Sequence, residues 1–305
     1  MIIHAALIGA RLAHFVAMLS LFGVACFPSH GIRGPAPDGF SAWRKSMLGG
    51  SAIAALSSGC AWFVLTAADM NGDAASALDP AILSTLVIDT DFGKLWILRM
   101  TGCVFLAVMA LAPRARPRRD LAGPLFTGLS ALVLASLAVT GHGAMPGGWI
   151  GELHATADAI HLLAAGVWIG ALWALGWLVS RRPDCPQTAK ALRRFSTVGQ
   201  LAVGVLIVTG LANSAALVGE PSRLLTTTYG LLLLGKLAAF GAMVVLAGLN
   251  RFWLVPRMTL GSAGVVAMRL KHHVLAEQGL AMAVIGIVAG LGTLDPTAAA
   301  ATFGR

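Results

Sequence analysis

Charged residues are scarce in this sequence. Asp, Glu, Lys and Arg make up 11% of the 305 residues, whereas 57% of the residues are hydrophobic and the mean hydropathy is +0.80. A soluble chain of this length carries about 25% charged residues. The composition therefore excludes an ordinary soluble globular protein and predicts a polytopic membrane protein built from apolar helices.

Cysteine is also rare, and the motifs of several enzyme and pump classes are missing. The four cysteines, Cys26, Cys60, Cys103 and Cys185, form no CxxC pair and predict no disulfide framework. The sequence has no GxxxxGK[ST] phosphate loop and no DKTG-like phosphorylation motif, which excludes transport driven by ATP in this chain. No HExxH zinc motif and no Ser-His-Asp arrangement occurs either. We therefore expect a protein that is not an enzyme.

Long apolar runs fill most of the chain. Eight runs of about 20 residues can be drawn, and each is long enough to cross a bilayer as a helix. They cover residues 3–27, 45–68, 93–112, 121–142, 157–180, 195–218, 228–250 and 273–294. We predict an all-α bundle of eight transmembrane helices that forms a single integral membrane domain over residues 1–305. The first run contains Arg11 and His14 and lacks a basic start, so we expect a retained helix rather than a cleaved signal.

Basic residues are concentrated in alternate connections. Sixteen of the 22 Lys and Arg follow the first, third, fifth and seventh runs, whereas only Arg223 and Arg305 fall in the opposite loops and the C-terminal tail. By the positive-inside rule the basic loops face the cytoplasm, so both termini face the periplasm. The net charge of +9 is then explained by topology, and nucleic acid is not expected as a partner. The sixteen residues are Arg33, Arg44, Lys45, Arg114, Arg116, Arg118, Arg119, Arg181, Arg182, Lys190, Arg193, Arg194, Arg251, Arg257, Arg269 and Lys271.

The two halves of the chain share short stretches of sequence. "ARLAHFVA" from Ala10 aligns with "ADAIHLLA" from Ala157, and "TDFGKLWILR" aligns with "TTYGLLLLGK". Both matches pair helices that run in the same direction. This predicts a parallel four-plus-four repeat with halves 1–150 and 151–305, related by an axis along the membrane normal. We then expect His14 to face His161 and Arg11 to lie near Asp158.

Histidines gather near the predicted outer ends of three helices. The i, i+4, i+7 spacing of His154, Asp158 and His161 places them on one stripe at the start of the fifth helix. Imidazole and thioether groups together favour copper, and methionine favours Cu(I). A single helical histidine is also a common hydrogen-bonded core residue, and opposite charges can simply neutralise each other. The predicted copper ligands are His142, His154 and His161, supported by Asp158, His14, Met145 and His4.

Several longer stretches resemble one family. They are "TGHG" at the end of the fourth run, "HLLAAGVWIGAL", "FSTVGQLAVGVLIVTGLANS", "TTYGLLLLGKLAAFGAMVVLAGLNRFWLVP" and "LAEQGLAMAVIGIVAGLGTLDP". The chain resembles the CopD family of bacterial copper-homeostasis proteins, most specifically over residues 140–296. The resemblance implies an inner-membrane, multi-pass protein that handles copper, as Cu(I) or Cu(II), and moves it inward. It also implies a periplasmic CopC-like copper-binding partner. The chain resembles a stand-alone member of the family, to which no CopC-like β domain is fused.

A second function class remains open. Paired histidines on neighbouring helices also ligate haem, so a membrane b-type haem protein for electron transfer is the alternative. That interpretation needs His14, His142 or His161 to pair across a flat cavity and makes no use of His154, Asp158 or Met145.

Overall fold

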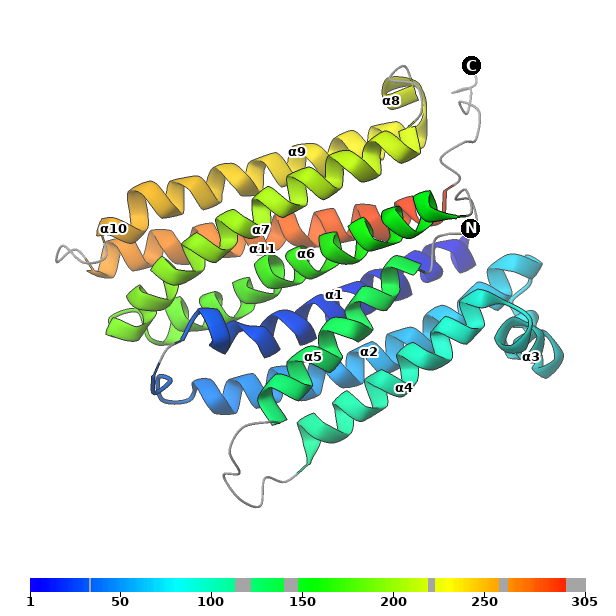
Figure 1. Cartoon of the computed structure of the whole chain (residues 1–305), viewed down its shortest axis with the longest axis horizontal. Coiled ribbons are helices and arrows are strands. Elements are labelled where there is room, and N and C mark those ends of the chain that lie inside the picture. The colour runs from blue at the N-terminus through cyan, green and yellow to red at the C-terminus, as the bar shows by residue number, and fades with distance from the viewer. Residues whose placement is uncertain (33, 113–121, 140–147, 219–222, 258–262, 295–305) are drawn as a thin grey trace.

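The computed structural model describes residues 1–305 apart from 33, 113–121, 140–147, 219–222, 258–262 and 295–305. Throughout the described residues the regular structure is helical, and they contain no strand (Figure 1). The prediction of an all-α fold is therefore confirmed.

Eight main helices correspond to the eight predicted runs. Seven of those in the described chain are long and apolar enough to cross a membrane. The remaining one, α5, lies in a shorter apolar stretch, Gly123–Val139. The prediction of eight spans is thus confirmed for seven helices. The eight are α1 (Ile2–His30), α2 (Phe40–Asn71), α4 (Asp91–Leu111), α5 (Ala122–Ala135), α6 (Trp149–Arg181), α7 (Pro186–Val218), α9 (Thr228–Leu249) and α11 (Ala263–Leu291).

Short elements occupy the connections. The 3-10 helix η1 (Ala75–Leu78) and α3 (Pro80–Ile88) join α2 to α4, and α8 (Arg223–Thr226) precedes α9. The π-helix η3 (Asn250–Leu254) and α10 (Val255–Arg257) extend α9.

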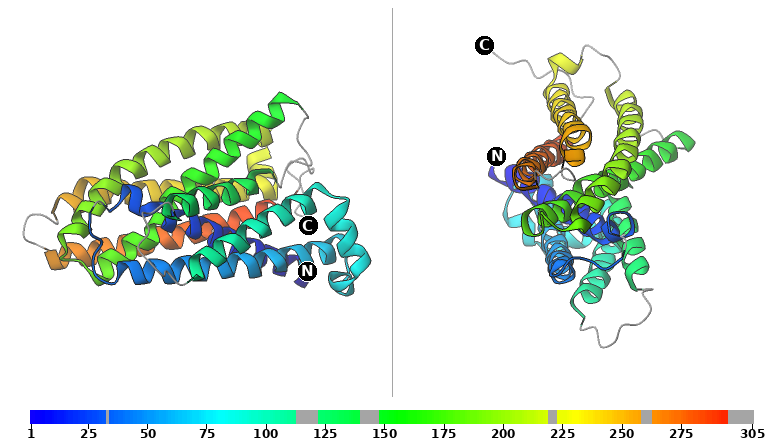
Figure 2. Two further views of the ribbon diagram at one scale, coloured as in Figure 1. Left: turned by 60° about the horizontal axis from the view of Figure 1, so that its bottom comes forward. Right: turned by 90° about the vertical axis from the view of Figure 1, so that its left-hand side faces the viewer.

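The long helices lie side by side and alternate in direction. The ends at which α1, α4, α6 and α9 begin lie together, on the side of the molecule that carries α3 and α8 (Figure 1). Seen along the helices, α9 lies at one edge of the bundle and α4 near the other (Figure 2, right). Both α1 and α6 pack on α5, on α11 and on each other. These two helices therefore form the centre of the bundle.

Glycines allow α1 and α6 to approach closely. A Cβ atom at Gly170 would lie 2.5 Å from the Leu19 carbonyl oxygen and 2.6 Å from the Gly23 Cα. A Cβ atom at Gly23 would in turn overlap the Gly166 carbonyl oxygen and the Gly170 Cα. Small residues at this spacing let helix backbones touch within a membrane. We call this contact of Leu19, Gly23, Gly166 and Gly170 the glycine seam.

Candidate functional site

Polar side chains near the start of α6 face α7. The Asp158 Oδ1 accepts a hydrogen bond from Asn213 Nδ2 at 2.5 Å, and His161 Nδ1 lies 2.8 Å from Thr209 Oγ1. His154 lies one turn before Asp158 and is half-buried. Because α6 and α7 are antiparallel neighbours, successive turns of one helix meet successive turns of the other. We call the group of Asp158, His161, Thr209 and Asn213 the α6 pocket.

The hydrogen bonds in this pocket favour one tautomer of a neutral His161. The Thr209 hydroxyl donates to the Val205 carbonyl oxygen at 2.7 Å, so its single proton is already used. In the arrangement that satisfies both contacts, Thr209 Oγ1 accepts the proton of His161 Nδ1. A neutral ring protonated at Nδ1 keeps its lone pair on Nε2, which is how an oriented histidine binds a metal. The Nε2 lone pair of His161 is therefore left available in this arrangement.

Helix α9 contributes a positive charge to the same pocket. Lys236 is within electrostatic range of both His161 and Asp158, and Tyr229 is within range of Asp158. The pocket therefore combines one imidazole, one carboxylate and one ammonium group between α6, α7 and α9. Ionisable groups inside a bilayer are costly and usually belong to a pathway or to a partner.

His14 occupies a comparable pocket in the first half of the chain. The ring is fully buried, and its Nδ1 lies 3.0 Å from the Ala55 carbonyl oxygen and 3.3 Å from Ser58 Oγ, both on α2. A carbonyl oxygen can only accept, so Nδ1 donates its proton and the lone pair is again on Nε2. That Nε2 atom is buried and has no hydrogen-bond partner in the described part of the chain. His14 and His161 thus both keep their lone pair on Nε2.

Aromatic and basic groups surround His14. The Trp62 ring meets His14 edge-on, with ring centroids 5.6 Å apart, and the Arg11 guanidinium lies 4.9 Å from the Trp62 ring centroid. Arg99 of α4 is 1% exposed and donates from Nε to Ser136 Oγ at 3.0 Å. This pocket contains no carboxylate among these neighbours, in contrast to the α6 pocket.

The structure does not bring His14 and His161 together. His14 contacts α2, whereas His161 contacts α7. The reason lies in the glycine seam, because Gly23 follows His14 by nine residues and Gly170 follows His161 by nine. Nine residues of a helix turn the side chain by about 180°. The predicted proximity is therefore wrong, since both histidines point away from the face through which α1 and α6 touch.

Arg11 and Asp158 also have separate partners. Arg11 Nε donates to the Ala289 carbonyl oxygen of α11 at 3.1 Å, whereas Asp158 accepts from Asn213 of α7. Arg11 and Asp158 therefore do not neutralise each other as a pair, because Arg11 contacts α11 and Asp158 contacts α7.

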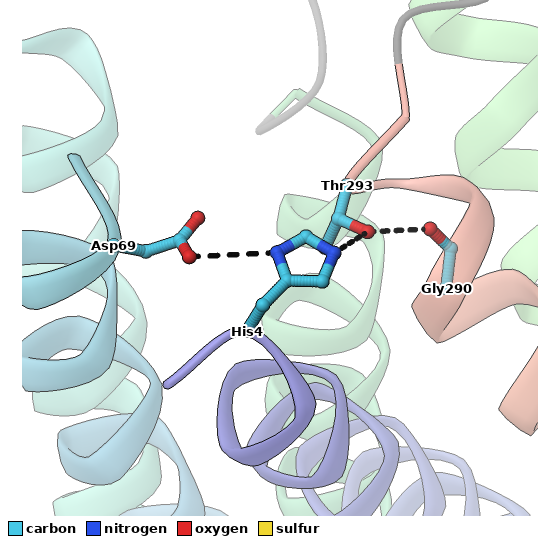
Figure 3. A network of polar contacts seen from close by, with 4 residues as sticks. All are labelled: His4, Asp69, Gly290 and Thr293. Carbon is cyan, nitrogen blue, oxygen red and sulfur yellow. Dashed lines mark hydrogen bonds and ion pairs between the residues drawn. The ribbon is translucent and has the colours of Figure 1, made fainter. Parts of the chain in front are cut away.

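His4 lies at the end of the bundle where α1 begins. Its Nδ1 is 3.4 Å from Asp69 Oδ1 of α2, and its Nε2 is 3.3 Å from Thr293 Oγ1 (Figure 3). His142 and Met145 lie outside the described residues. Among the residues that are described, no three His, Cys, Asp or Glu side chains gather closely enough to hold a metal ion.

Sequence reasoning missed the partners that orient the two histidines. Ser58 and Thr209 begin the stretches "SGCAW" and "TGLAN", and in each the hydroxyl residue contacts the histidine of its half. The following glycines, Gly59 and Gly210, lie against the Cε1 atom of the same rings. A small hydroxyl residue followed by glycine in the helix after each histidine was the available signal.

Comparisons with known proteins identify the family. The profile described as "Copper resistance protein D-like, N-terminal domain" matches residues 1–152, and that described as "Copper resistance protein D" matches residues 189–291. The chain is 33% identical over 302 residues to "Copper resistance protein D" of Pseudomonas syringae pv. tomato, covering 95% of this chain and 96% of that protein. No solved structure matches the chain.

Two further relatives cover less of the sequence. "Inner membrane protein YebZ" of Escherichia coli (strain K12) is 34% identical over 214 residues, or 69% of this chain and 71% of that protein. "Copper transport protein CutJ" of Bacillus subtilis (strain 168) is 32% identical over 195 residues, or 61% of this chain and 35% of that protein. The chain has long apolar helices, and the two family profiles match its first and second halves. It is therefore a multi-pass membrane protein that belongs to the copper resistance protein D (CopD) family.

Proposed function

We propose that the protein imports copper across the bacterial inner membrane. The observation that carries the proposal is the α6 pocket, in which His161 offers its Nε2 lone pair near the Asp158 carboxylate within an apolar bundle. Imidazole suits copper, and a neighbouring carboxylate offsets the charge of the ion. The printed names of two relatives, an inner membrane protein and a copper transport protein, support the location and the cargo.

Copper is received in this proposal at the periplasmic end of α6. His142 and Met145 precede α6 in the chain, and His154 lies about two turns before His161 on that helix. The ion is captured by His142, His154 and Met145 and then passes to His161 beside Asp158. His4 belongs to the same end of the bundle through its contact with Asp69. A CopC-like protein would deliver copper to this surface.

The proposed orientation follows from the basic loops. Arg44, Arg181 and Arg257 lie at the end of the bundle opposite the start of α1 and α6. Basic loops stay in the cytoplasm, so the starts of α1 and α6 face the periplasm. Reporter fusions near residues 75 and 148 are expected to read as periplasmic, and fusions near 117 and 187 as cytoplasmic. The reverse pattern would contradict the orientation and with it the side from which copper enters.

We also propose that the halves 1–150 and 151–305 are related by a pseudo-twofold axis through the glycine seam. Leu19 and Gly23 correspond to Gly166 and Gly170 at the offset that aligns His14 with His161. The contacts are reciprocal, because Gly23 meets Gly166 while Gly170 meets Leu19. Reciprocal contacts of this kind are the mark of a twofold interface.

The first residues of α4 and α9 also support the proposed pseudo-twofold relation between the two halves. Thr90 Oγ1 accepts from Gly93 N at 3.0 Å at the start of α4, and Thr227 Oγ1 accepts from Gly230 N at 2.9 Å at the start of α9. Both threonines are N-caps with nearly equal backbone angles, φ −113° and ψ 145° against φ −114° and ψ 150°. Such agreement of position, residue type and conformation favours a duplicated four-helix unit.

Copper accumulation in cells tests the function. His161→Ala is expected to lower uptake at limiting copper at least 10–100-fold, which is the loss typical of removing even an outer partner of a metal ligand. His272→Ala is the matched control, because His272 is an exposed histidine of α11 at the other end of the bundle. Membrane levels of each variant are compared by immunoblot. Wild-type uptake by both His161→Ala and His142→Ala would refute the site, and a Soret band in the purified protein would favour the haem alternative.

A further inference from the structure

Soft ligands line a second buried pocket that the proposed uptake site does not use. His14 and Met18 lie one turn apart on α1, and Met100 and Cys103 lie one turn apart on α4. All four side chains are buried, with His14 and Cys103 at 0%, Met18 at 1% and Met100 at 7% exposure. Because α1 and α4 run in the same direction, the two pairs can meet at matching levels.

The contacts bring these pairs together. Cys103 Sγ donates to Met18 Sδ at 3.9 Å. At the neighbouring level, a Cβ atom at Gly59 would lie 2.7 Å from Met100 Sδ and 3.1 Å from His14 Cε1. Thus the lack of a side chain at Gly59 of α2 leaves the space in which the imidazole of α1 and the thioether of α4 approach each other.

The spacing of the sulfur atoms suits a single metal ion. With a metal–sulfur bond of about 2.3 Å, two ligands at tetrahedral positions lie about 3.8 Å apart. The observed 3.9 Å between Cys103 Sγ and Met18 Sδ is close to that value. His14 Nε2 is buried and has no hydrogen-bond partner in the described residues, while its Nδ1 is held by Ala55. Its lone pair is therefore not used in a hydrogen bond within the described residues and can coordinate a metal ion.

We propose that His14, Met18, Met100 and Cys103 form a buried Cu(I) site in the first half of the protein. Thiolate and thioether ligands select Cu(I) over harder cations, and an imidazole completes such a set. The site is separate from the α6 pocket, where the neighbours of the histidine are oxygen and nitrogen groups. Its role as a station on the copper route depends on the proposed transport function, whereas its ability to bind Cu(I) does not.

The charge of the pocket is unchanged by the proposed binding. Arg99 lies within electrostatic range of both His14 and Cys103. When Cu(I) binds, Cys103 loses its thiol proton to solvent and becomes a thiolate, so one positive charge replaces another. The metal–sulfur bond replaces the S–H bond without any change of oxidation state. This exchange allows a monovalent cation to be held beside a buried guanidinium, since no net charge is added to the apolar interior.

Anaerobic titration of the purified full-length protein in nanodiscs tests the site, with Cu(I) as the probe and a chromophoric Cu(I) chelator as competitor. The wild type is expected to bind Cu(I) with sulfur scatterers in its X-ray absorption spectrum. The variant Met18→Leu/Met100→Leu/Cys103→Ala is expected to lose one equivalent of Cu(I) together with most of the sulfur scattering, because Met145 alone supplies sulfur at the proposed uptake site. Met109→Leu/Cys185→Ser provides a matched control, because both residues lie outside the pocket. Thermal unfolding of each protein establishes that the variants are folded.

A second variant guards against loss of fold in the triple variant. Gly59→Ala keeps all four ligands but puts a methyl group between Met100 Sδ and His14 Cε1, so it is also expected to weaken Cu(I) binding at this site. Retention of the wild-type stoichiometry and sulfur scattering in both variants would overturn the proposal. His161→Ala separates this inference from the proposed function. It is expected to keep the sulfur-bound Cu(I), whereas wild-type uptake by both His161→Ala and His142→Ala would refute the uptake site and leave this one intact.

Discussion

Replacing Thr209 by valine tests how the α6 pocket prepares its histidine. Thr209 is 8% exposed, and its Oγ1 lies 2.8 Å from His161 Nδ1. Valine keeps the branched shape but has no oxygen to accept the Nδ1 proton. The ring then loses both its fixed orientation and its preference for a lone pair on Nε2. Loss of a partner of this kind lowers metal affinity about 10–100-fold, which corresponds to about 1.4–2.7 kcal/mol.

The assay is the initial rate of copper uptake as a function of external copper. Thr209→Val is expected to raise the half-saturating copper concentration about 10–100-fold, because the ligand remains but is poorly oriented. Thr209→Ser retains the hydroxyl and should stay near the wild type. If Thr209→Val has the wild-type half-saturation while His161→Ala abolishes uptake, the hydroxyl does not orient the ring and the reasoning fails.

Three further predictions concern stability and are measured by thermal unfolding of the protein in detergent. Gly170→Val forces side-chain atoms against the Leu19 carbonyl and should destabilise the bundle by about 1–3 kcal/mol, whereas Gly204→Val, in open space on α7, should cost less. Asn250→Leu removes the amide that joins Glu277 to His273 and should cost about 1–3 kcal/mol; an unchanged midpoint would mean that Glu277 finds another partner. Thr227→Ala removes the N-cap of α9 and should cost about 1 kcal/mol, and no loss would indicate that the cap is dispensable.

Hydropathy alone predicted the helices well, because the bilayer demands long apolar runs with internally satisfied backbones. The run 157–180 corresponds to α6, and 228–250 corresponds to α9. The connection between α2 and α4 was harder, since α3 is a nine-residue helix that begins with an Asp79 cap. Short helices of that kind carry no transmembrane signal.

The candidate site was predicted only in part. The stripe of Asp158 and His161 follows from helical spacing, but their partners Asn213 and Thr209 come from a different helix and depend on packing. The prediction that His14 and His161 face each other was wrong, although the sequence contained the signal needed to correct it. Glycines nine residues further along each helix already marked the opposite face as the one for close contact.

The spacing of residues along the sequence also failed to reveal the sulfur-lined pocket of His14, Met18, Met100 and Cys103. Met18 looks like one more apolar residue in an apolar run, and methionines usually fill gaps in helical bundles. Its meaning depends on Cys103 and Met100, which lie more than eighty residues away in the sequence and meet it only through the arrangement of α1, α2 and α4.

The glycine seam has a consequence for how the two halves can differ. Two identical subunits that met through such a reciprocal contact would have to carry the same chemistry on both sides of the axis. Joining them in one chain removes that requirement, so each position can mutate independently of its counterpart. In the first half, the Arg11 guanidinium lies over the Trp62 ring. At the corresponding place in the second half, Asp158 accepts a hydrogen bond from Asn213. Under the proposed duplication, one half carries the polar α6 pocket and the other carries the sulfur-lined pocket.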